Sequence, residues 1–444
     1  MKSPPFSHQL SGRFSAAGET RSTIRGHCPA VLRMYQKKRL YLLASGLLGL
    51  ALMSLEVGAQ DGLTLERAVS LAYERNPEFS AARAEIGIAS GLRRQAAAIP
   101  NPELGFEVED TQSDRQTRSI TITQPIELGG KRGARIGVAD ANRSMVDADL
   151  DVRRQGLRAD VIQAFFAALR AQEGMRLAEA SLSLAERAAK VADAQVDAGK
   201  VSPVEATRAD MQLATVQLDL RRARQEWDNA RQMLARMLGT DAPDFGDLMG
   251  SFEHLPEVPS ESALLARVRE SADMRRALRQ VALSEAELGL ERSQRYPNIS
   301  VSIGSQYDEI ERERINLVGL SVPLPLFDRN QGNVLAAARR AEQARDLRNA
   351  AELRVRAEIQ QALRDWRTAL GDVEEIRNRI LPAGQRTVEA ATRGFSLGRF
   401  AFLDVLDAQR ALIDARTRYL QSLQAVVDAW ARIERLYGPT TTFE

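Results

Sequence analysis

The longest pattern in the chain is a row of apolar residues at alternating spacings of three and four, which begins near Leu150 and ends at Val196. Its members are mostly alanines: Leu157, Val161, Ala164, Ala168, Ala171, Met175, Ala178, Leu182, Ala185, Ala189 and Ala192. This spacing predicts one packed helix over 134–198, and the small side chains allow neighbouring backbones to approach closely. At 1.5 Å per residue the helix is on the order of 100 Å long, which is too long for a compact domain.

Two short runs with a period of two precede this helix. Their apolar members are Leu104, Phe106, Val108, Ile120 and Ile122, and polar residues or glycine fill the positions between them. The alternation predicts a β-hairpin over 103–124 with one apolar face. A helix over 63–99, interrupted at Asn76-Pro77, precedes the hairpin, and a return helix over 202–238 follows the long helix.

The same order of patterns recurs in the second half of the chain. We expect a helix from Glu261 to Arg295, a hairpin over 298–323, a second long helix over 332–397 and a return helix over 401–437. Gly199 and Gly398 stand 199 positions apart, as do Gly239 and Gly438. This agreement in register indicates an internal duplication.

We therefore divide the mature chain into a first repeat at 60–239, a linker at 240–260, a second repeat at 261–438 and a tail at 439–444. In each repeat the two shorter helices, placed end to end, match the long helix in length and can lie alongside it. Each repeat then has a strand hairpin at one end and a glycine-marked turn at the other. Pro382 should kink the second long helix. The expected fold class is mainly α with a small β component.

Residues 1–59 have the pattern of an export signal behind an over-long start. A basic cluster at 37–39 precedes an apolar run at 40–55, and Val57-Gly58-Ala59 is a small-residue cleavage site. Met34 is then the expected translation start. The alternative is an N-terminal membrane anchor, but an apolar run of about 16 residues barely spans a bilayer, which needs about 20.

Composition argues against several classes of function. The formal net charge is +2, whereas nucleic-acid binding needs a strongly basic domain or stripe. Cleavage would remove Cys28, the only cysteine, so no disulfide is expected. His254 then remains as a single histidine, which we interpret as a surface loop residue and not a metal ligand. We expect no cofactor and no catalytic residue, because the chain has no phosphate-binding glycine loop and no nucleophile with an identifiable base.

The two hairpins suggest strands of an outer-membrane β-barrel. Amphipathic strands of about 9–11 residues suit a thin apolar layer, and the chain carries an export signal. Four strands leave two open edges, and unpaired backbone groups cannot face lipid. Three copies would close an even antiparallel barrel with a polar interior. The alternative is a periplasmic coiled-coil scaffold with two accessory hairpins, which would extract in aqueous buffer.

Four short motifs carry a family resemblance. They are Pro100-Asn101-Pro102-Glu103-Leu104, Gln124-Pro125-Ile126-Glu127-Leu128-Gly129-Gly130-Lys131-Arg132, Gly394-Phe395-Ser396-Leu397-Gly398 and Phe402-Leu403-Asp404-Val405-Leu406-Asp407-Ala408. In the last two motifs the chain resembles the TolC family of outer-membrane efflux channels. In the first two it resembles the CzcC-type branch of that family, which works with heavy-metal efflux pumps. The resemblance extends over 63–438.

The resemblance implies a homotrimer in the outer membrane of a Gram-negative bacterium. A twelve-stranded β-barrel, with four strands from each chain, would continue into an α-helical barrel that spans the periplasm. The implied function is a passive conduit in a tripartite system, with a periplasmic adaptor and an inner-membrane pump of the resistance-nodulation-division (RND) type as partners. The expected cargo is heavy-metal cations of the cobalt, zinc and cadmium type. An exit duct for drugs or secreted polypeptides remains an alternative.

The resemblance also implies a gate at the periplasmic tip. Asp404 and Asp407 match the acidic positions of the family, and Glu205 matches the acidic position in the first repeat. Threefold symmetry makes each carboxylate a ring of three, which concentrates negative potential in a narrow pore and attracts cations. Without the resemblance, the two aspartates would be interpreted as a solvated helix face.

This sequence differs from drug-exporting relatives at the latch of the gate. Phe395 stands where they carry a tyrosine and Phe400 where they carry an arginine, so their polar latch cannot be copied. Two alternatives are open: the adjacent Arg399 replaces the latch, or the two phenylalanines make an apolar contact. The tip turns, Gly199-Lys200 and Gly398-Arg399, are the expected docking site of the adaptor, since glycine permits the left-handed backbone of a tight turn.

Overall fold

The computed structural model describes residues 62–110, 115–252 and 256–439. The export signal, Met34, Cys28, His254 and almost all of the expected tail lie outside the described residues. The described residues belong to one compact unit. Within the described ranges, no helix combines the length and the apolar character needed to cross a membrane.

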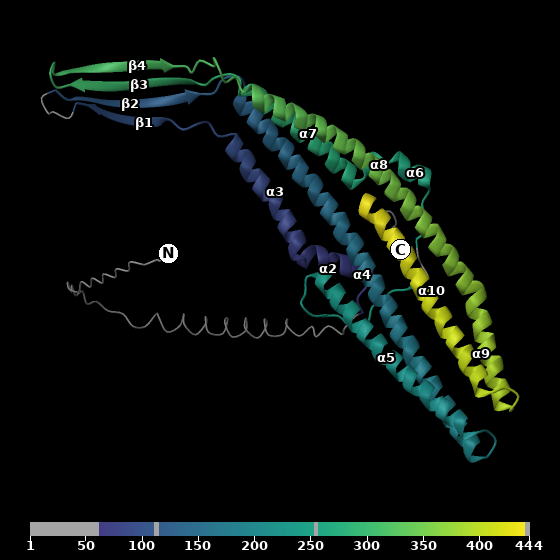
Figure 1. The fold of residues 1–444 in the computed structure, drawn as a ribbon. Coiled ribbons are helices and arrows are strands. Elements are labelled where there is room, and N and C mark those ends of the chain that lie inside the picture. Colours follow the sequence, from purple (N-terminus) through teal and green to yellow (C-terminus); the bar gives the residue numbers. More distant parts are fainter. Residues whose placement is uncertain (1–61, 111–114, 253–255, 440–444) are drawn as a thin grey trace, which may run out of the picture. The chain divides into compact units, whose positions relative to one another are not determined.

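The four strands form one antiparallel sheet in the order β1-β2-β3-β4 (Figure 1). They are β1 (Glu103–Glu109), β2 (Thr117–Ile126), β3 (Ile299–Asp308) and β4 (Glu313–Ser321). Strands β2 and β3, which are far apart in the sequence, pair along their whole length, with Ile122 opposite Ile303. β1 and β4 are the two edges, and no other strand among the described residues pairs with them.

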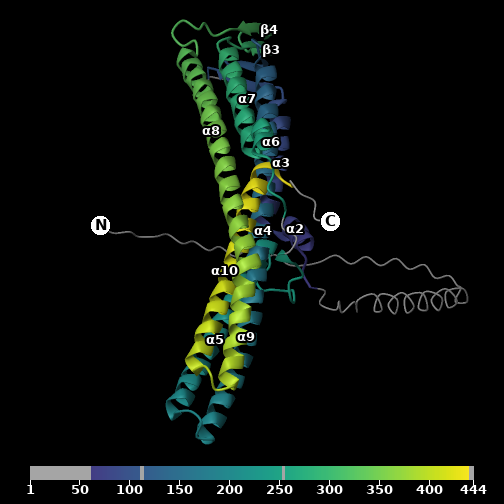
Figure 2. The ribbon, with the colours of Figure 1, turned by 90° about the vertical axis from the view of Figure 1, so that its right-hand side faces the viewer.

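The core of the helical part is a single unbroken helix, α4 (Lys131–Asp197), which has 67 residues. On the side of the sheet it packs against α3 (Pro77–Ala96) and α7 (Ala272–Ser293), and on the side of the tip against α5 (Pro203–Leu238) and α10 (Phe402–Tyr437) (Figure 2). Most alanines of its seam, among them Ala168, Ala185 and Ala192, are buried, which lets these helices lie close together.

The second long helix is not continuous. It consists of α8 (Gln331–Glu375), a π-helical turn at Ile376–Ile380, and α9 (Leu381–Ser396). Pro382 has no N–H for the helical ladder and its ring crowds the preceding turn, so the disruption expected at this proline takes the form of a widened turn just before it.

The two shorter helices that precede the hairpins are also divided. Asn76 ends α2 (Leu65–Arg75) and caps α3: its Oδ1 accepts the Phe79 N–H at 3.1 Å, and its Nδ2 donates to the Met237 carbonyl at 3.1 Å. One helix was predicted over 261–295, but this segment is divided into α6 (Glu261–Ala266), a 3₁₀ turn and α7. Ser271, whose Oγ accepts the Met274 N–H at 3.4 Å, caps α7.

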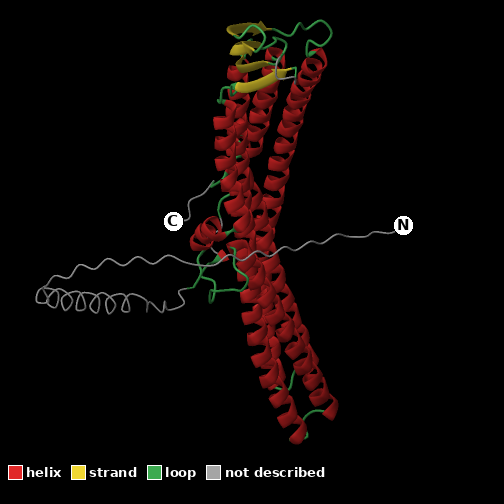
Figure 3. Cartoon of the chain, turned by 90° about the vertical axis from the view of Figure 1, so that its left-hand side faces the viewer, coloured by secondary structure: helices red, strands yellow, loops and turns green. Residues whose placement is uncertain are grey.

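Helices make up most of the unit, and the strands lie at one end of it (Figure 3). A belt of large side chains holds the middle of the helical part together. Trp366, Trp430 and Phe165 are fully buried there. The carboxylate of Glu434, which is also fully buried, accepts a hydrogen bond of 2.7 Å from Nε of Arg158 and one of 3.3 Å from Nε1 of Trp430. Because both charges are paired inside the core, this network fixes α10 against α4 in one register.

Candidate functional site

The two helical turns at the tip share one backbone geometry. In the first, Gly199 has φ +64°, and the N–H of Lys200 donates to the Gln195 carbonyl at 2.9 Å. In the second, Gly398 has φ +70°, and the N–H of Arg399 donates to the Gly394 carbonyl at 2.8 Å. In both turns, hydrogen bonds that follow a left-handed glycine satisfy the last carbonyls of the incoming helix. A residue with a side chain would strain the backbone at the glycine position.

The return helices begin with different caps. Ser202 starts α5, and its Oγ accepts the Val204 N–H at 3.4 Å. Ala401, which starts α10, has no side-chain oxygen, and here the carboxylate of Asp404 accepts the Ala401 N–H at 2.9 Å. Asp404 therefore has a structural role in addition to its charge, because it satisfies a free donor at the helix start.

The acidic residues at the tip occupy matching positions in the two return helices. Glu205 and Asp404 both stand at the third helical position, 199 residues apart. Glu205 pairs with Arg208 at 2.9 Å, and its Oε2 is buried without a partner among the described residues. The position that corresponds to Arg208 in the second helix is Asp407. Consequently α10 presents two exposed carboxylates one turn apart where α5 presents a neutral pair.

The aromatic residues of the tip pack in a way that the sequence did not indicate. The Phe395 ring contacts the ring of Phe402, with 5.4 Å between centroids, and both side chains are buried. Phe400 remains 51% exposed and lies over Gly394, where an added Cβ would overlap its ring. The contact of Phe395 with Phe402 thus joins the end of α9 to the start of α10, and Gly394 provides the space for Phe400.

A polar contact links the two helical hairpins just behind the tip. The guanidinium of Arg410 on α10 donates to Oε1 of Gln212 on α5 at 2.7 Å, and Gln212 is buried. Neither residue was predicted from the sequence. A signal was present, since Gln212 interrupts the apolar row of α5 that is formed by Ala209, Val216 and Leu220. Among the described residues, the Arg399 side chain has no hydrogen-bond or ion-pair partner.

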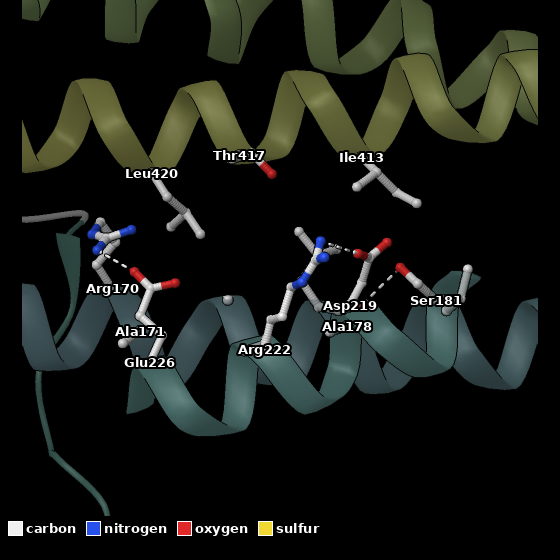
Figure 4. A pocket seen from close by; sticks show the side chains of 14 residues that line it. Arg170, Ala171, Ala178, Ser181, Asp219, Arg222, Glu226, Ile413, Thr417 and Leu420 are labelled. Atoms are coloured by element: carbon white, nitrogen blue, oxygen red, sulfur yellow. Dashed lines mark hydrogen bonds and ion pairs between the residues drawn. The ribbon is translucent and has the colours of Figure 1, made fainter. Parts of the chain in front are cut away.

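A cavity of about 330 Å³ separates α10 from α4 and α5 farther along the same hairpins (Figure 4). Ile413, Thr417 and Leu420 of α10 face it from one side. On the other side, Arg170 of α4 pairs with Glu226 of α5 at 2.6 Å. The packing of α10 is therefore loose between the tip and the central belt, and polar residues line part of this gap.

The motif at 124–132 is the joint between strand and helix. Nε2 of Gln124 donates to the Pro100 carbonyl at 3.0 Å, and Nζ of Lys131 donates to Oδ1 of Asn298 at 2.6 Å. Glu127 and Arg135 form a two-pronged ion pair. The hydrogen bonds from Arg135 hold the pKa of the Glu127 carboxyl below its usual value. The joint thus connects both hairpins to the start of α4.

Within the described ranges, no three His, Cys, Asp or Glu side chains gather closely enough to hold a metal ion. The acidic residues of the tip are separate carboxylates on a helix surface.

Comparisons with known proteins agree with this architecture. The model of the family "Outer membrane efflux protein" matches the chain over residues 68–240 and 266–439. The cobalt-zinc-cadmium resistance protein CzcC of Cupriavidus metallidurans is 38% identical over 376 residues, which is 85% of this chain and 90% of that protein. The nickel and cobalt resistance protein CnrC of the same organism is 28% identical over 312 residues, or 69% of this chain and 73% of that protein. The crystal structure of the outer membrane protein VceC from Vibrio cholerae superposes with a TM-score of 0.70 at 16% identity, covering 84% of this chain and 96% of that one.

Proposed function

Because the chain belongs to the outer membrane efflux protein family, we propose that it is the outer-membrane duct of a tripartite system that exports heavy-metal cations. The observation that carries the proposal is the identity with the cobalt-zinc-cadmium resistance protein, which extends over most of both chains. The similarity to a nickel and cobalt resistance protein supports the same class of cargo. Cobalt, zinc and cadmium are the expected ions.

The open edges of the sheet support a homotrimer as the functional unit. Unpaired N–H and C=O groups along β1 and β4 cannot face lipid, because each costs several kcal/mol there. Pairing β4 of one copy with β1 of the next removes every edge once the ring closes. Three copies supply twelve strands, an even number that closes around a wet lumen. The outer-membrane lipid then surrounds the apolar face of the sheet.

The duct is passive, and its partners supply energy and direction. An inner-membrane RND pump drives the export, and a periplasmic adaptor connects the pump to the tip. We place the adaptor on the two tip turns, at Gly199 and Lys200 and at Gly398 and Arg399. These turns are the outermost points of the two hairpins and have the same backbone geometry, so one adaptor surface can recognise both.

The gate consists of the acidic rings and of the contacts that hold α9 and α10 inward. In a trimer, Asp404 and Asp407 form two adjacent rings of carboxylates. Glu205 contributes less net charge, since Arg208 pairs with it. Negative potential in a narrow pore attracts cations and repels anions. Opening moves α10 away from α5, which breaks the Arg410–Gln212 hydrogen bond, and the adjacent cavity gives α10 space to move.

Deletion of the gene tests the cargo. The deletion strain and a strain that carries the gene on a plasmid are grown in increasing concentrations of zinc, cobalt, cadmium, nickel, copper and silver, and with a panel of drugs. We expect the deletion to lose tolerance to zinc, cobalt or cadmium and the plasmid to restore it. Drug sensitivity with unchanged metal tolerance would instead identify a drug duct of the same fold. A mature protein that is monomeric and soluble without detergent would contradict the duct altogether.

A further inference from the structure

Two arginines lie in one row across the sheet, next to the turns that join β1 to β2 and β3 to β4 (the loop end of the sheet). In the antiparallel register, Val108 is opposite Arg118, Arg118 is opposite Tyr307, and Tyr307 is opposite Arg314. Residues that are directly opposite each other project from the same face, and adjacent strands are about 4.8 Å apart. Arg118 and Arg314 therefore flank Tyr307 on one face, about 10 Å apart at the backbone.

Within the described strands, the basic and the acidic side chains project from opposite faces of the sheet. The face that carries the arginine row is otherwise mainly apolar, with Leu104, Phe106, Ile120, Ile122, Ile126, Ile299, Val301, Ile303, Val318 and Leu320. All carboxylates of the strands project from the opposite face: Glu103, Glu107, Glu109, Asp308 and Glu313. Along the strands, the arginines thus share their face with apolar residues and with no carboxylate, and Glu309 and Glu311 belong to the turn between β3 and β4.

The arginine row borders a hollow of about 620 Å³ on the apolar face. Arg118, Tyr307 and Arg314 line one part of it, and Phe106, Ile120, Ile122 and Ile303 line the rest. Nε and Nη2 of Arg118 donate to Oε1 of Gln116 at 2.9 and 2.6 Å, which orients this guanidinium. A polar, cationic end beside an apolar surface has the chemical pattern of a binding site for an amphiphile with an anionic head.

The position of the row is compatible with the membrane. An arginine on the lipid face costs about 2–4 kcal/mol at the bilayer midplane but about 0–1 kcal/mol near the interface. Tyr307 lies eight residues along β3 from Ile299, the first residue of the strand. At about 3.3 Å per residue this is roughly 26 Å along the strand, which for a strand tilted by about 40° is a rise of roughly 20 Å and reaches the outer part of an apolar band roughly 25 Å tall. The row therefore stands at the headgroup level on the loop side.

We propose that Arg118, Tyr307 and Arg314 bind the phosphate groups of the phosphorylated glycolipid in the outer leaflet, while its acyl chains cover the apolar residues below. Guanidinium groups donate paired hydrogen bonds to phosphate oxygens, and Tyr307 can add a third donor between them. The proposal rests on the proposed barrel, in which this face meets lipid. Closure by identical copies adds no strand carboxylate to this face, because β1 of a neighbour brings only Leu104, Phe106 and Val108 to it.

The test uses the mature trimer, purified in a neutral detergent and mixed with lipid A that carries two phosphates. Native mass spectrometry counts bound lipid, and lipid A without phosphates and inorganic phosphate are the comparison probes. We expect the wild type to bind the phosphorylated lipid at least about tenfold more tightly than the dephosphorylated one, since one charge-assisted hydrogen bond contributes about that factor. The double variant Arg118→Gln/Arg314→Gln should lose this preference.

Two further variants serve as controls. Arg118→Lys/Arg314→Lys keeps the charge and should retain part of the preference, and Arg115→Gln, which removes a basic residue of the turn outside the strands, should keep all of it. Equal binding of both lipids by the wild type, or an unchanged preference in the double glutamine variant, would overturn the proposal. Displacement of the lipid by millimolar inorganic phosphate would overturn it as well, since it would indicate a site for free phosphate.

Trimer formation and zinc tolerance are measured for the same variants. Normal trimers and normal tolerance without lipid discrimination contradict the lipid site alone, whereas failure of the wild type to form trimers contradicts the proposed function. The two failures are therefore distinguishable.

Discussion

The guanidinium of Arg410 donates a hydrogen bond of 2.7 Å to the buried side chain of Gln212. The two residues belong to the return helices of different hairpins, α10 and α5, and behind them the cavity at Ile413 and Thr417 separates the same hairpins. Near the tip, this hydrogen bond and the apolar cluster around Phe402 fix α10 against the neighbouring helices.

Removal of this contact should open the tip. We predict that Arg410→Met raises the single-channel conductance of purified trimers in planar bilayers, because α10 loses a hydrogen bond of a charged donor, which is typically about 1.5–3 kcal/mol. Arg418→Met removes an exposed arginine from the same helix and should leave the conductance unchanged. Equal conductance of Arg410→Met and the wild type would show that the contact does not hold the gate.

Gly398→Val should abolish export while trimers still form. Gly398 has φ +70°, where a β-branched residue is strongly disfavoured, although a Cβ would meet no atom within 4 Å. The turn must therefore change its backbone, and the adaptor surface changes with it. Gly398→Asn is the matched control, because asparagine tolerates the left-handed region. Metal tolerance and the amount of trimer are measured in parallel, and normal metal tolerance of the valine variant would refute the docking role of the turn.

The two aspartates of α10 should respond differently to substitution. Asp407→Ala is expected to lower the cation selectivity of the channel, measured as a reversal potential in a salt gradient, without a change in thermal stability. Asp404→Ala should lower both, because it also removes the acceptor of the Ala401 N–H at the helix start, which costs about 1 kcal/mol. Asp404→Asn keeps an acceptor oxygen and should restore stability but not selectivity. Unchanged selectivity in all three variants would exclude these residues from the gate.

The Glu127–Arg135 pair should make stability depend on pH. The pKa of Glu127 is lowered in the folded protein by its hydrogen bonds with Arg135. Its contribution is therefore present above the unfolded-state pKa of about 4.3 and is lost as the pH falls through the lower pKa of the folded state. We predict that Glu127→Gln unfolds at a lower temperature than the wild type at pH 7, by the equivalent of about 1 kcal/mol, and that the difference shrinks below pH 4.

Glu186→Gln, which removes an exposed carboxylate of α4, is the control for this series and should melt like the wild type at both pH values. A difference between Glu127→Gln and the wild type that stays constant down to pH 3 would show that the charge of the pair is not its source.

Periodic patterns predicted most of the architecture, and local geometry explains what they missed. The seam of α4 and the alternation in the strands are long and regular, so the fold class could be inferred from sequence, and the structural neighbours confirm it. The break at Ser271 could not be inferred, because a single capping serine within an apolar pattern also occurs in continuous helices. The π turn before Pro382 was expected only as a kink.

At the tip, too, the sequence indicated individual residues but not the contacts between helices. The sequence identified Asp404, Asp407 and Phe395 by resemblance, and their role in a gate stays a prediction. The contact of Phe395 with Phe402 and the hydrogen bond between Arg410 and Gln212 depend on how α9 and α10 pack in space. Likewise the arginine row requires the pairing of β2 with β3, which no local pattern specifies.

The two long helices of the chain differ in continuity. α4 runs without interruption from the strand joint to the tip, whereas its counterpart is divided by the widened turn at Ile376–Ile380. A torque applied at the tip turns would therefore be transmitted along α4, whereas it would bend the second long helix at Ile376–Ile380. In the proposed trimer, dilation of the pore would then need no rearrangement in the membrane, since the interrupted helix of every chain would bend while α4 keeps its shape.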